Sequence, residues 1–283
     1  MPTQDLQPLL RLEHITKAFS GVTVLDDVRF DVWPGEVHAL IGENGAGKST
    51  LMNIVTGSYY ADSGQVFWKG QPVEIRTPHQ AHQLGINIVH QELMLVPQLS
   101  IGENVFLGRH PVGRRYSRWV RWSEINSQSK SLLETLGHPL DPRRPVNELS
   151  IAEQQLVEIA RALAFSAELI IMDEPTSSLA SSDIQRLFDL IKRLKARNVS
   201  VVFIGHRMEE VLGLADRVVV MRDGENAGSL PIEEASEDTI IRLMVGRKIE
   251  LYPKEAVTIG SPILEVRNLS DGKRIRNVSF TVM

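Results

Sequence analysis

The sequence predicts an α/β protein with three parts: a core with a mostly parallel β-sheet, an N-terminal antiparallel β-subdomain and an inserted α-helical subdomain. Short apolar stretches alternate with stretches of helical periodicity from residue 36 to residue 204, and strands that alternate with helices form parallel sheets. Residues 9 to 32 show two strand-like stretches around Gly21, which is typical of an antiparallel hairpin. Residues 103 to 165 are mostly polar with helical spacing, which predicts the helical subdomain.

The composition fits a folded protein without extreme charge. The chain has 283 residues, of which 42% are hydrophobic, so it can bury a substantial core. It has no cysteine, which excludes disulfides and thiolate metal sites. The formal net charge of -4 gives no reason to expect nucleic acid or an anionic membrane as a partner. No apolar stretch reaches the roughly 18 residues that span a bilayer, and the N-terminus lacks the layout of a signal peptide. We therefore expect a soluble protein that contacts a membrane only through a partner.

Three antiparallel hairpins are predicted from their turns. The first joins LLRLEHIT and VTVLDDVRFDV around Gly21, within residues 9 to 32. The second is GQVFWKGQPV, at residues 64 to 73. The third is VVVMRDGENAG, at residues 218 to 228, in which Asp223-Gly224 supplies a two-residue turn.

Three short apolar stretches predict buried strands of the parallel sheet. They are EVHALI at residues 36 to 41, LIIM at 169 to 172 and VSVVFI at 199 to 204. A helix separates the last two, because its apolar residues recur at helical spacing and share one face: Ile184, Leu187, Phe188, Ile191 and Leu194.

A glycine-rich loop follows the first of these strands directly. It reads Gly42-Glu43-Asn44-Gly45-Ala46-Gly47-Lys48-Ser49, and a helix begins within it. This is the spacing of a Walker A loop, whose backbone N–H groups and helix N-terminus surround a polyphosphate. Lys48 would reach the β and γ phosphates, and Ser49 would offer its hydroxyl oxygen to Mg²⁺. An ordinary glycine-rich turn is the weaker alternative, because the motif lies between the strand and the helix that it requires. The sequence therefore predicts binding of ATP with Mg²⁺.

Two carboxylates end the strand LIIM, at Asp173 and Glu174. If the sheet is parallel, both lie beside the phosphate loop. Asp173 suits the shell of Mg²⁺, and Glu174, on the other side of the pleat, suits a base that polarises the attacking water. His206 follows the next strand in the same way and could hold the γ-phosphate and the water. A lone histidine after a strand is more often structural, but this placement favours the functional role.

These motifs together resemble the ATP-binding-cassette family. The glycine-rich loop, Gln91 in IVHQE, LSIAEQQ at 149 to 155, Asp173-Glu174, SSLA at 177 to 180 and His206 occur in the family's order and approximate spacing over residues 8 to 246. More narrowly, longer segments resemble the ATPase subunits of bacterial monosaccharide importers of the ribose, galactose, xylose and arabinose type, which carry two cassettes in one chain. These segments are ALIGENGAGKSTLMNIVTG, HQELMLVPQLSIGENVFLG, QQLVEIARAL, MDEPTSSL, HRMEEV and MVGRKIELYP.

The resemblance implies a P-loop NTPase core and adds site residues. Phe19 would stack on adenine, with a place in the hairpin core as the alternative. Gln91 would touch Mg²⁺ and report the nucleotide state to the helical segment after it, with a free polar loop residue as the alternative. The nucleotide-binding set is then Phe19, Gly42, Glu43, Asn44, Gly45, Ala46, Gly47, Lys48, Ser49, Thr50, Gln91 and Ser150; the Mg²⁺ set is Ser49, Gln91 and Asp173; the catalytic set is Lys48, Glu174 and His206.

The resemblance also implies the protein's activity and partners. The chain would be an ATPase, cytoplasmic and peripheral on the inner face of the cell membrane, that drives import of a monosaccharide or related small solute. Its partners would be integral-membrane permease subunits, facing residues 93 to 107, a periplasmic solute-binding protein, and a second cassette from its own C-terminal half or another copy. No nucleic acid is expected. Two alternatives stay open: a soluble tandem-cassette ATPase acting on ribosomes or nucleic acid, which has a longer and more basic linker, and a non-hydrolysing nucleotide switch.

The segment LSIAEQQ departs from the family's pattern, because Ile151 and Ala152 replace two expected glycines. In the family, this segment begins a helix whose N-terminus points at the γ-phosphate of ATP on the opposite cassette. Ser150 and Glu153 also form a capping box, which explains a helix start without any phosphate. Both interpretations can hold, since a capped N-terminus still presents backbone donors. Ala152 is the more serious change, because its methyl lies where phosphate and backbone should almost touch.

Two other positions depart from the pattern. Ala180 stands where many relatives carry aspartate, and Gly205 where serine or threonine is usual. Whether Ala152 and Ala180 weaken a composite site stays open.

The end of the chain repeats its beginning. Val266, Leu269 and Ser270 align with Leu12, Ile15 and Thr16, and NVSFTV at 277 to 282 aligns with DVRFDV at 27 to 32. Chance similarity of two β-rich stretches is the alternative. We expect an ATP-binding cassette at 1–246 with a helical and signature subdomain at about 92–160, a linker at 247–262, and the first strands of a second, truncated cassette at 263–283.

Overall fold

The computed structural model describes residues 7–109, 120–177, 179–246 and 260–283. The chain divides into two compact units, Met1–Arg247 and Lys248–Met283. Most of the expected linker, residues 247–259, lies outside the described residues. Among the described helices, none combines the length and the apolar character needed to cross a membrane.

A six-stranded, mostly parallel sheet forms the centre of the first unit, as predicted. Its strands follow the order β10-β9-β3-β8-β7-β6, and only β10 runs antiparallel to its neighbour. The predicted apolar stretches form its middle strands, which are buried along almost their whole length. The strands are β3 (Val37–Ile41), β6 (Ile86–Val89), β7 (Leu169–Asp173), β8 (Ser200–Ile204), β9 (Arg217–Arg222) and β10 (Glu225–Pro231).

A four-stranded antiparallel sheet forms the N-terminal β-subdomain, with the order β2-β1-β4-β5. Its strands are β1 (Leu10–Phe19), β2 (Val22–Val32), β4 (Ser63–Trp68) and β5 (Gln71–Val73). The first two predicted hairpins are therefore confirmed. The third is confirmed in the central sheet, where Asp223 and Gly224 have φ values of 50° and 85°, as a two-residue turn between β9 and β10 requires.

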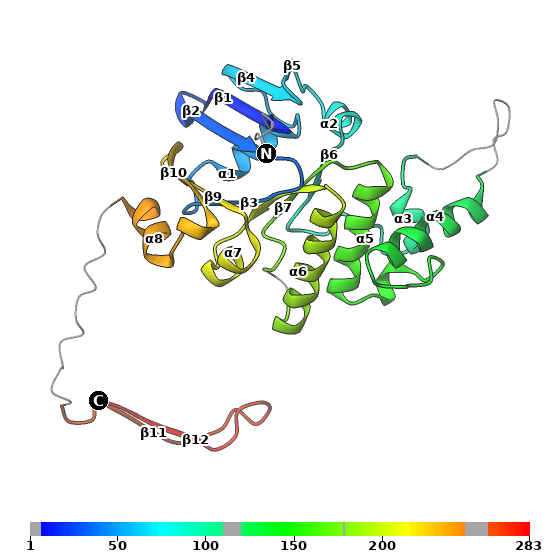
Figure 1. Cartoon of the computed structure of the whole chain (residues 1–283). Coiled ribbons are helices and arrows are strands. Elements are labelled where there is room, and N and C mark those ends of the chain that lie inside the picture. The colour runs from blue at the N-terminus through cyan, green and yellow to red at the C-terminus, as the bar shows by residue number, and fades with distance from the viewer. Residues whose placement is uncertain (1–6, 110–119, 178, 247–259) are drawn as a thin grey trace. The chain divides into compact units, whose positions relative to one another are not determined.

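Helix α1 (Lys48–Val55) lies between the two sheets (Figure 1). Its buried residues Leu51 and Val55 belong to one core with residues of β1 and β2 and with residues of β3, β7 and β8. Because α1 begins in the glycine-rich loop, burial of its apolar residues also fixes the loop against the central sheet. The loop is thus attached to the best-packed part of the unit.

Helices α3, α4, α5 and α6, together with α7 and α8, pack on the opposite face of the central sheet, whereas α2 shares the core of α1 (Figure 1). One hydrophobic core contains residues of helices α3, α4, α5 and α6 and of strands β7 and β8. A smaller core contains residues of α7, α8, β3 and β9. The predicted helix with apolar residues on one face is α6, although Leu190 is also buried and Ile184 only partly so. The helices are α2 (Pro78–Leu84), α3 (Ile101–Val105), α4 (Trp122–Thr135), η1 (Val146–Glu148), α5 (Ile151–Ala164), α6 (Ser181–Ala196), α7 (Met208–Leu214), η2 (Ile232–Glu234) and α8 (Glu237–Val245).

The described part of the second unit is a hairpin of β11 (Leu264–Leu269) and β12 (Val278–Val282) whose register matches that of β1 and β2. Both hairpins shift register at the same place, after Leu12 in the first and after Val266 in the second. The paired residues are Leu10–Val32, Leu12–Phe30 and Ile15–Val28 in the first hairpin, and Leu264–Val282, Val266–Phe280 and Leu269–Val278 in the second.

The irregular backbone positions of the two hairpins also correspond. His14 and Asn268 both have a φ of 56°, and Asp27 and Asn277 have φ values of 51° and 52°. The N–H of Asp27 donates to the hydroxyl of Thr16 at 3.3 Å, and the N–H of Asn277 donates to the hydroxyl of Ser270 at 2.8 Å. The sequence alignment of the two segments is therefore matched by a likeness of local structure.

We expect the two matched phenylalanines to differ sharply in their effect on the stability of the first unit. Phe30 is 2% exposed, whereas Phe280 is 47% exposed. Phe30→Ala should lower the free energy of unfolding by about 3–5 kcal/mol, and Phe280→Ala should leave it nearly unchanged. Thermal unfolding checks this, together with deletion of residues 262–283. A loss on deletion as large as that of Phe30→Ala would show that the hairpin is integral to the first unit.

We also expect His38 to make the protein less stable in mild acid. His38 is 1% exposed, and its Nε2 accepts a hydrogen bond from the N–H of Trp33 at 3.1 Å. Its pKa is lowered to about 4, mainly by burial and to a lesser extent by the positive charge of Arg217. The charge of Asp216 has a smaller effect in the opposite direction. Below about pH 6.5 the unfolded chain therefore binds a proton that the folded chain does not accept, and stability falls as the pH decreases towards 4.

The size of this effect approaches about 1.4 kcal/mol per pH unit well below pH 6.5, and it amounts to about 2 kcal/mol between pH 7 and 5. His38→Gln keeps an acceptor for Trp33 but does not titrate, so its stability should depend less on pH. Urea unfolding of both proteins at pH 7, 6 and 5 measures the difference. Equal slopes in the two proteins would contradict the role given to His38.

Candidate nucleotide-binding site

The glycine-rich loop connects the end of β3 to the start of α1. Gly47 is the N-cap of α1, with a φ of 96°, and no side chain caps this helix N-terminus. The first N–H groups of a helix have no partner within the helix. The loop therefore leaves backbone donors at a positive helix end, which is the arrangement that binds phosphate groups.

Close packing explains why glycine is required at two positions of the loop. A Cβ on Gly42 would lie 2.3 Å from the carbonyl oxygen of Met221, and one on Gly47 would lie 2.6 Å from Cδ2 of Leu25. The φ of Gly47 is also in the region that side chains disfavour. The loop is thus held between β2 and β9, elements that come from both sheets.

Lys48 lies over this loop with its ammonium group inside the protein. It is 9% exposed, and its Nζ donates to the carbonyl oxygens of Gly42 at 2.8 Å and Glu43 at 2.9 Å. Burial lowers the pKa of Lys48, while the charges of Glu174 and Asp173 act in the opposite direction. The cation is therefore aimed into the loop and partly balanced by two carboxylates.

The two predicted carboxylates line one cleft. Asp173 ends β7; burial raises its pKa, the charge of Glu174 raises it further, and His90 and Lys48 act against this. Glu174 has a φ of 45°, and its N–H donates to the carbonyl oxygen of Ile204 at 3.0 Å. We expected Glu174 on the other side of the pleat. Glu174 has already left the strand conformation that alternates side chains, so the pleat does not set its direction, and it lines the same cleft as Asp173.

His206 lies next to Glu174, as its position after β8 predicts. Its Nδ1 is 3.7 Å from Oε1 of Glu174, and the two side chains are 60% and 26% exposed. Gly205, where the family usually has serine or threonine, is packed against Phe203: a Cβ there would lie 2.7 Å from the phenylalanine ring. A side chain at position 205 would therefore require Phe203 to move.

The cleft has a volume of about 330 Å³ and brings most of the predicted residues together. Two lining residues, Val24 and Ile204, were not predicted from the sequence. The predicted residues that do not line it are Phe19, Gly42, Glu43, Ala46, Gln91, Ser150 and His206. The full lining is Val24, Asn44, Gly45, Gly47, Lys48, Ser49, Thr50, Asp173, Glu174 and Ile204.

Phe19 lies at the end of β1 and is 39% exposed, so it is not a hairpin core residue. Its ring contacts the edge of Tyr59, with 5.2 Å between ring centroids, and Nζ of Lys17 is also 5.2 Å from its centroid. Sequence reasoning missed Tyr59. The aromatic pair in TGSYY, directly after α1, was the signal that could have indicated it.

Gln91 follows β6 and is exposed. Its neighbour His90 comes close enough to Asp173 to lower the pKa of that carboxyl. The loop after β6 therefore approaches the cleft from the strand next to β7. Sequence reasoning missed His90, although its place at the carboxyl end of a parallel strand pointed to the same edge of the sheet.

Ser150 starts α5 with the predicted capping box. The Ser150 hydroxyl accepts from the N–H of Glu153 at 3.3 Å, and the N–H of Ser150 donates to Oε2 of Glu153 at 2.8 Å. Ile151 is 46% exposed at this helix start. Ser150 and the phosphate loop line different pockets of the first unit.

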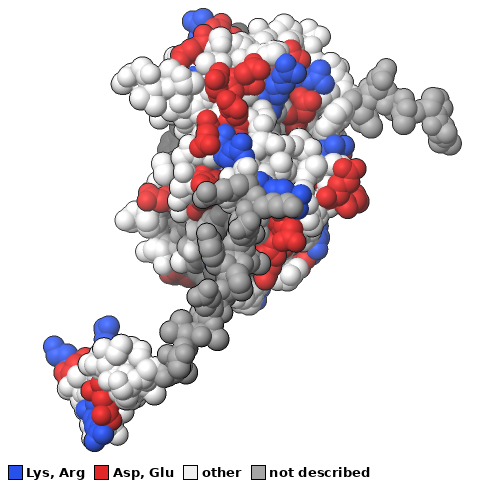
Figure 2. All heavy atoms as spheres, turned by 90° about the vertical axis from the view of Figure 1, so that its left-hand side faces the viewer, with Lys and Arg blue, Asp and Glu red and all other residues white. Residues whose placement is uncertain are grey.

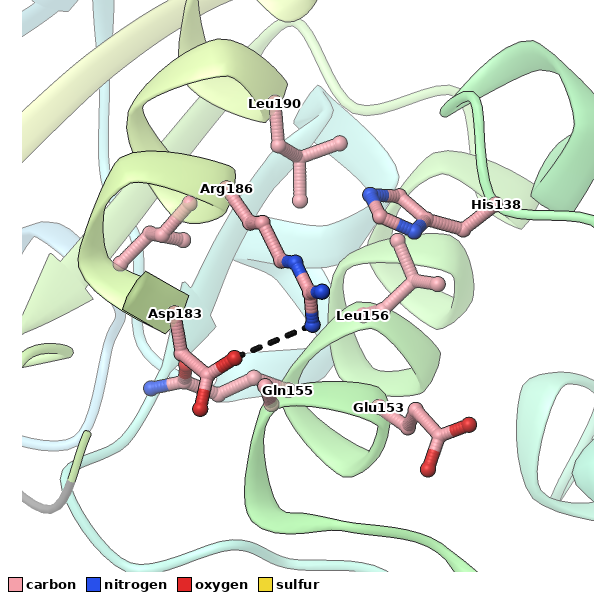
Figure 3. A pocket seen from close by; sticks show the side chains of 9 residues that line it. His138, Glu153, Gln155, Leu156, Asp183, Arg186 and Leu190 are labelled. Atoms are coloured by element: carbon pink, nitrogen blue, oxygen red, sulfur yellow. Dashed lines mark hydrogen bonds and ion pairs between the residues drawn. The ribbon is translucent and has the colours of Figure 1, made fainter. Parts of the chain in front are cut away.

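Ala152 faces helix α6, where a small pocket separates the two helices (Figure 3). In that pocket Arg186 pairs with Asp183 at 3.2 Å. Gln155, one turn further along α5, donates to the carbonyl oxygen of Pro175 and so connects α5 to the segment after Glu174. Ala180 is the N-cap of α6 and makes no side-chain cap, whereas an aspartate at an N-cap would supply one.

Known proteins resemble this chain in sequence and in fold. The model of a family described as "ABC transporter" matches residues 25–177, which is more than half of the chain. A putative ribose/galactose/methyl galactoside import ATP-binding protein of Burkholderia cenocepacia is 47% identical over 98% of this chain. A ribose import ATP-binding protein of Rubrobacter xylanophilus is 46% identical, also over 98% of this chain. The chain spans 54% and 56% of these two relatives, or about half their length.

Solved structures show the same fold. An ATP-binding cassette of an ABC transporter in its ADP conformation matches 85% of this chain and 100% of its own, with 29% identity and a TM-score of 0.75. A nucleotide-free cassette from an ABC transporter matches 87% of this chain and 99% of its own, with 28% identity and a TM-score of 0.73. The fold is thus that of a P-loop NTPase with a mostly parallel sheet and an antiparallel subdomain. From this match and the family model, the chain belongs to the ABC transporter family.

Proposed function

We propose that this chain binds ATP with Mg²⁺ and hydrolyses it to drive import of a monosaccharide or related small solute through a membrane permease. The observation that carries the proposal is that Lys48, Asp173 and Glu174 line one cleft and that His206 lies beside Glu174. The sugar-import names of the relatives support the choice of solute class.

The loop and its helix would hold the phosphates. Backbone N–H groups from Gly42 to Thr50 would surround them, and the ammonium of Lys48 would exchange its two carbonyl acceptors for phosphate oxygens. The ring of Phe19 would stack on the adenine. Tyr59, which contacts Phe19 edge-on, would fix the orientation of that ring.

The residues at the cleft fit a Mg²⁺ ion. The hydroxyl of Ser49 and the carboxylate of Asp173 are oxygen ligands that line the same cleft. Burial and the charge of Glu174 raise the pKa of Asp173, so a cation beside it would favour its ionised form. Gln91 would add a third oxygen from the loop after β6. When bound, Mg²⁺ neutralises phosphate charge.

Glu174 and His206 would carry out the hydrolysis. The carboxylate of Glu174 would accept a hydrogen bond from the attacking water and orient it towards the γ-phosphate. His206, with its Nδ1 at 3.7 Å from that carboxylate, would contact the γ-phosphate and the same water. Lys48 would stabilise the negative charge on the transferred phosphoryl group.

The N-terminus of α5 would serve a second cassette. Ser150 and the backbone donors at this helix start would contact the γ-phosphate bound to the opposite cassette. Ala152 adds a methyl group at this helix start and Ala180 offers no carboxylate, and comparing ATP turnover of Ala152→Gly with wild type would decide whether they weaken this composite site.

We further propose the domain arrangement and the partners. An ATP-binding cassette would extend over 1–246 with its helical and signature subdomain at about 92–160, followed by a linker at 247–262 and the start of a second cassette at 263–283. The matching hairpins support the second cassette. The partners would be permease subunits, a periplasmic solute-binding protein and a second cassette, with the protein on the cytoplasmic face of the membrane.

The alternatives have less support. On the face seen in Figure 2, the described basic and acidic side chains are interspersed rather than gathered into a basic stripe, whereas nucleic-acid binding needs clustered positive charge. Ala152 and Ala180 favour the alternative of a non-hydrolysing nucleotide switch. It does not explain why Lys48, Asp173, Glu174 and His206 are all retained.

Lys48→Ala should abolish measurable ATP binding in calorimetry, because it removes the cation that faces the phosphates. Lys69→Ala is a matched control, since Lys69 is half exposed and pairs with Glu168 outside the cleft. Wild-type affinity in Lys48→Ala would rule out this phosphate site.

Glu174→Gln should keep ATP binding and lower turnover by about 10²-fold or more, because the water-orienting group is lost. Glu209→Gln, at an exposed position of α7, serves as control. Phosphate release measures turnover, and uptake of labelled monosaccharides by cells carrying the variant tests the transport part. Unchanged turnover would refute the role of Glu174, and unchanged uptake despite lost turnover would refute the coupling to import.

A further inference from the structure

Glu158 is a buried acid on α5 to which the proposed ATP chemistry gives no role. It is 7% exposed, and burial raises the pKa of its carboxyl against the opposing effects of Met94 and Arg161. Its Oε2 is one of the few buried side-chain polar atoms, among the described residues, that have no hydrogen-bond partner. Burying such a group costs stability. A leucine at this position of the helix would avoid that cost.

The other carboxylate oxygen of Glu158 holds the loop that follows β6. Oε1 accepts a hydrogen bond from the N–H of Met94 at 2.5 Å. Arg161, one turn further along α5, donates to the carbonyl oxygen of Met94 at 3.4 Å. Helix α5 therefore binds both backbone groups of a single loop residue, while the Met94 side chain is 62% exposed.

This attachment limits where Gln91 can go. Among the described residues, the hydrogen bonds found between positions 91–95 and other elements are the two at Met94. The next attachment is at Val96, whose N–H and carbonyl bond to Asn104 at 2.8 and 3.1 Å. Three residues span at most about 10 Å. Gln91 lies two residues after the end of β6 and three before Met94, so while the Met94 bonds hold, its loop is held by β6 on one side and by α5 on the other.

We propose that Glu158 is a positioning residue: by binding the Met94 N–H it ties the loop of Gln91 to helix α5, so that the two move together. This rests on the proposed roles of Gln91 at Mg²⁺ and of the α5 N-terminus at a second nucleotide. A displacement of α5, whose N-cap is Ser150, would then also displace Gln91, the proposed Mg²⁺ ligand. The buried carboxylate has a function in this arrangement that an apolar residue could not supply.

The first test compares Glu158→Gln with Glu158→Leu in the full chain. Glutamine keeps an oxygen acceptor for Met94, and leucine removes it while filling similar space. Hydrogen exchange of the Met94 amide should be about 3- to 10-fold faster in Glu158→Leu, as expected for loss of one hydrogen bond, and little changed in Glu158→Gln. Equal exchange of the Met94 amide in all three proteins would overturn the proposal.

The second measurement separates positioning from general damage. In Glu158→Leu, the Mg²⁺ concentration needed for half-maximal ATP turnover should rise about 3- to 10-fold, whereas ATP binding without Mg²⁺ should stay at the wild-type level. An unchanged Mg²⁺ requirement would contradict the link from Glu158 to Gln91. If Lys48→Ala keeps ATP binding, the proposed function fails instead, and the exchange result still decides whether Glu158 holds the loop.

A second pair of variants covers the case in which Glu158→Leu does not fold. Met94→Pro deletes the amide donor from the loop side, and Met94→Ala keeps it while removing an exposed side chain. Met94→Pro should raise the Mg²⁺ requirement as Glu158→Leu does, and Met94→Ala should not. Equal requirements in these two variants would overturn the proposal.

Discussion

The site depends on how a buried ammonium group is balanced. Lys48 is almost fully enclosed, and a cation in such a place needs oxygen acceptors around it. Two acceptors come from its own loop and two negative charges from the end of β7. The order β3-β8-β7 lets the carboxyl ends of these parallel strands meet at one edge. The sheet order, the loop and the packing of α1 all serve this balance.

The fold was predictable because its signals are local and repeated. The alternation of apolar and polar residues and the length of the apolar stretches predicted the hairpins and the middle strands. The dipeptide Asp223-Gly224 predicted the turn between β9 and β10. The site was predictable where the spacing of a motif identifies its residues, as in the glycine-rich loop and at the strand ends. At Glu174 the alternation of the strand no longer applies, because the backbone there is left-handed. Sequence reasoning missed Tyr59 and His90, since side-chain contacts between separate loops leave no periodic signal in a sequence.

The two hairpins show how much of a local structure a short sequence can specify. Their non-glycine left-handed residues occur at matched places, at His14 and Asn268 and again at Asp27 and Asn277. Asp and Asn tolerate this conformation better than most residues. The same register shift follows in both hairpins, yet the apolar face that the first buries is exposed in the second. Local residues thus set the register, whereas burial depends on further elements.

The departures from the family's pattern fall at the ends of segments and leave the core intact. At Gly205 the ring of Phe203 occupies the space of a side chain, and at Ala180 helix α6 begins without a side-chain cap. At Ala152 the helix start is secured by Ser150 and Glu153. Each of these segments keeps its place in the fold, so the fold tolerates the change. Such replacements alter what the segment end can offer to a nucleotide, because recognition of phosphate depends on donors and close approach rather than on packing.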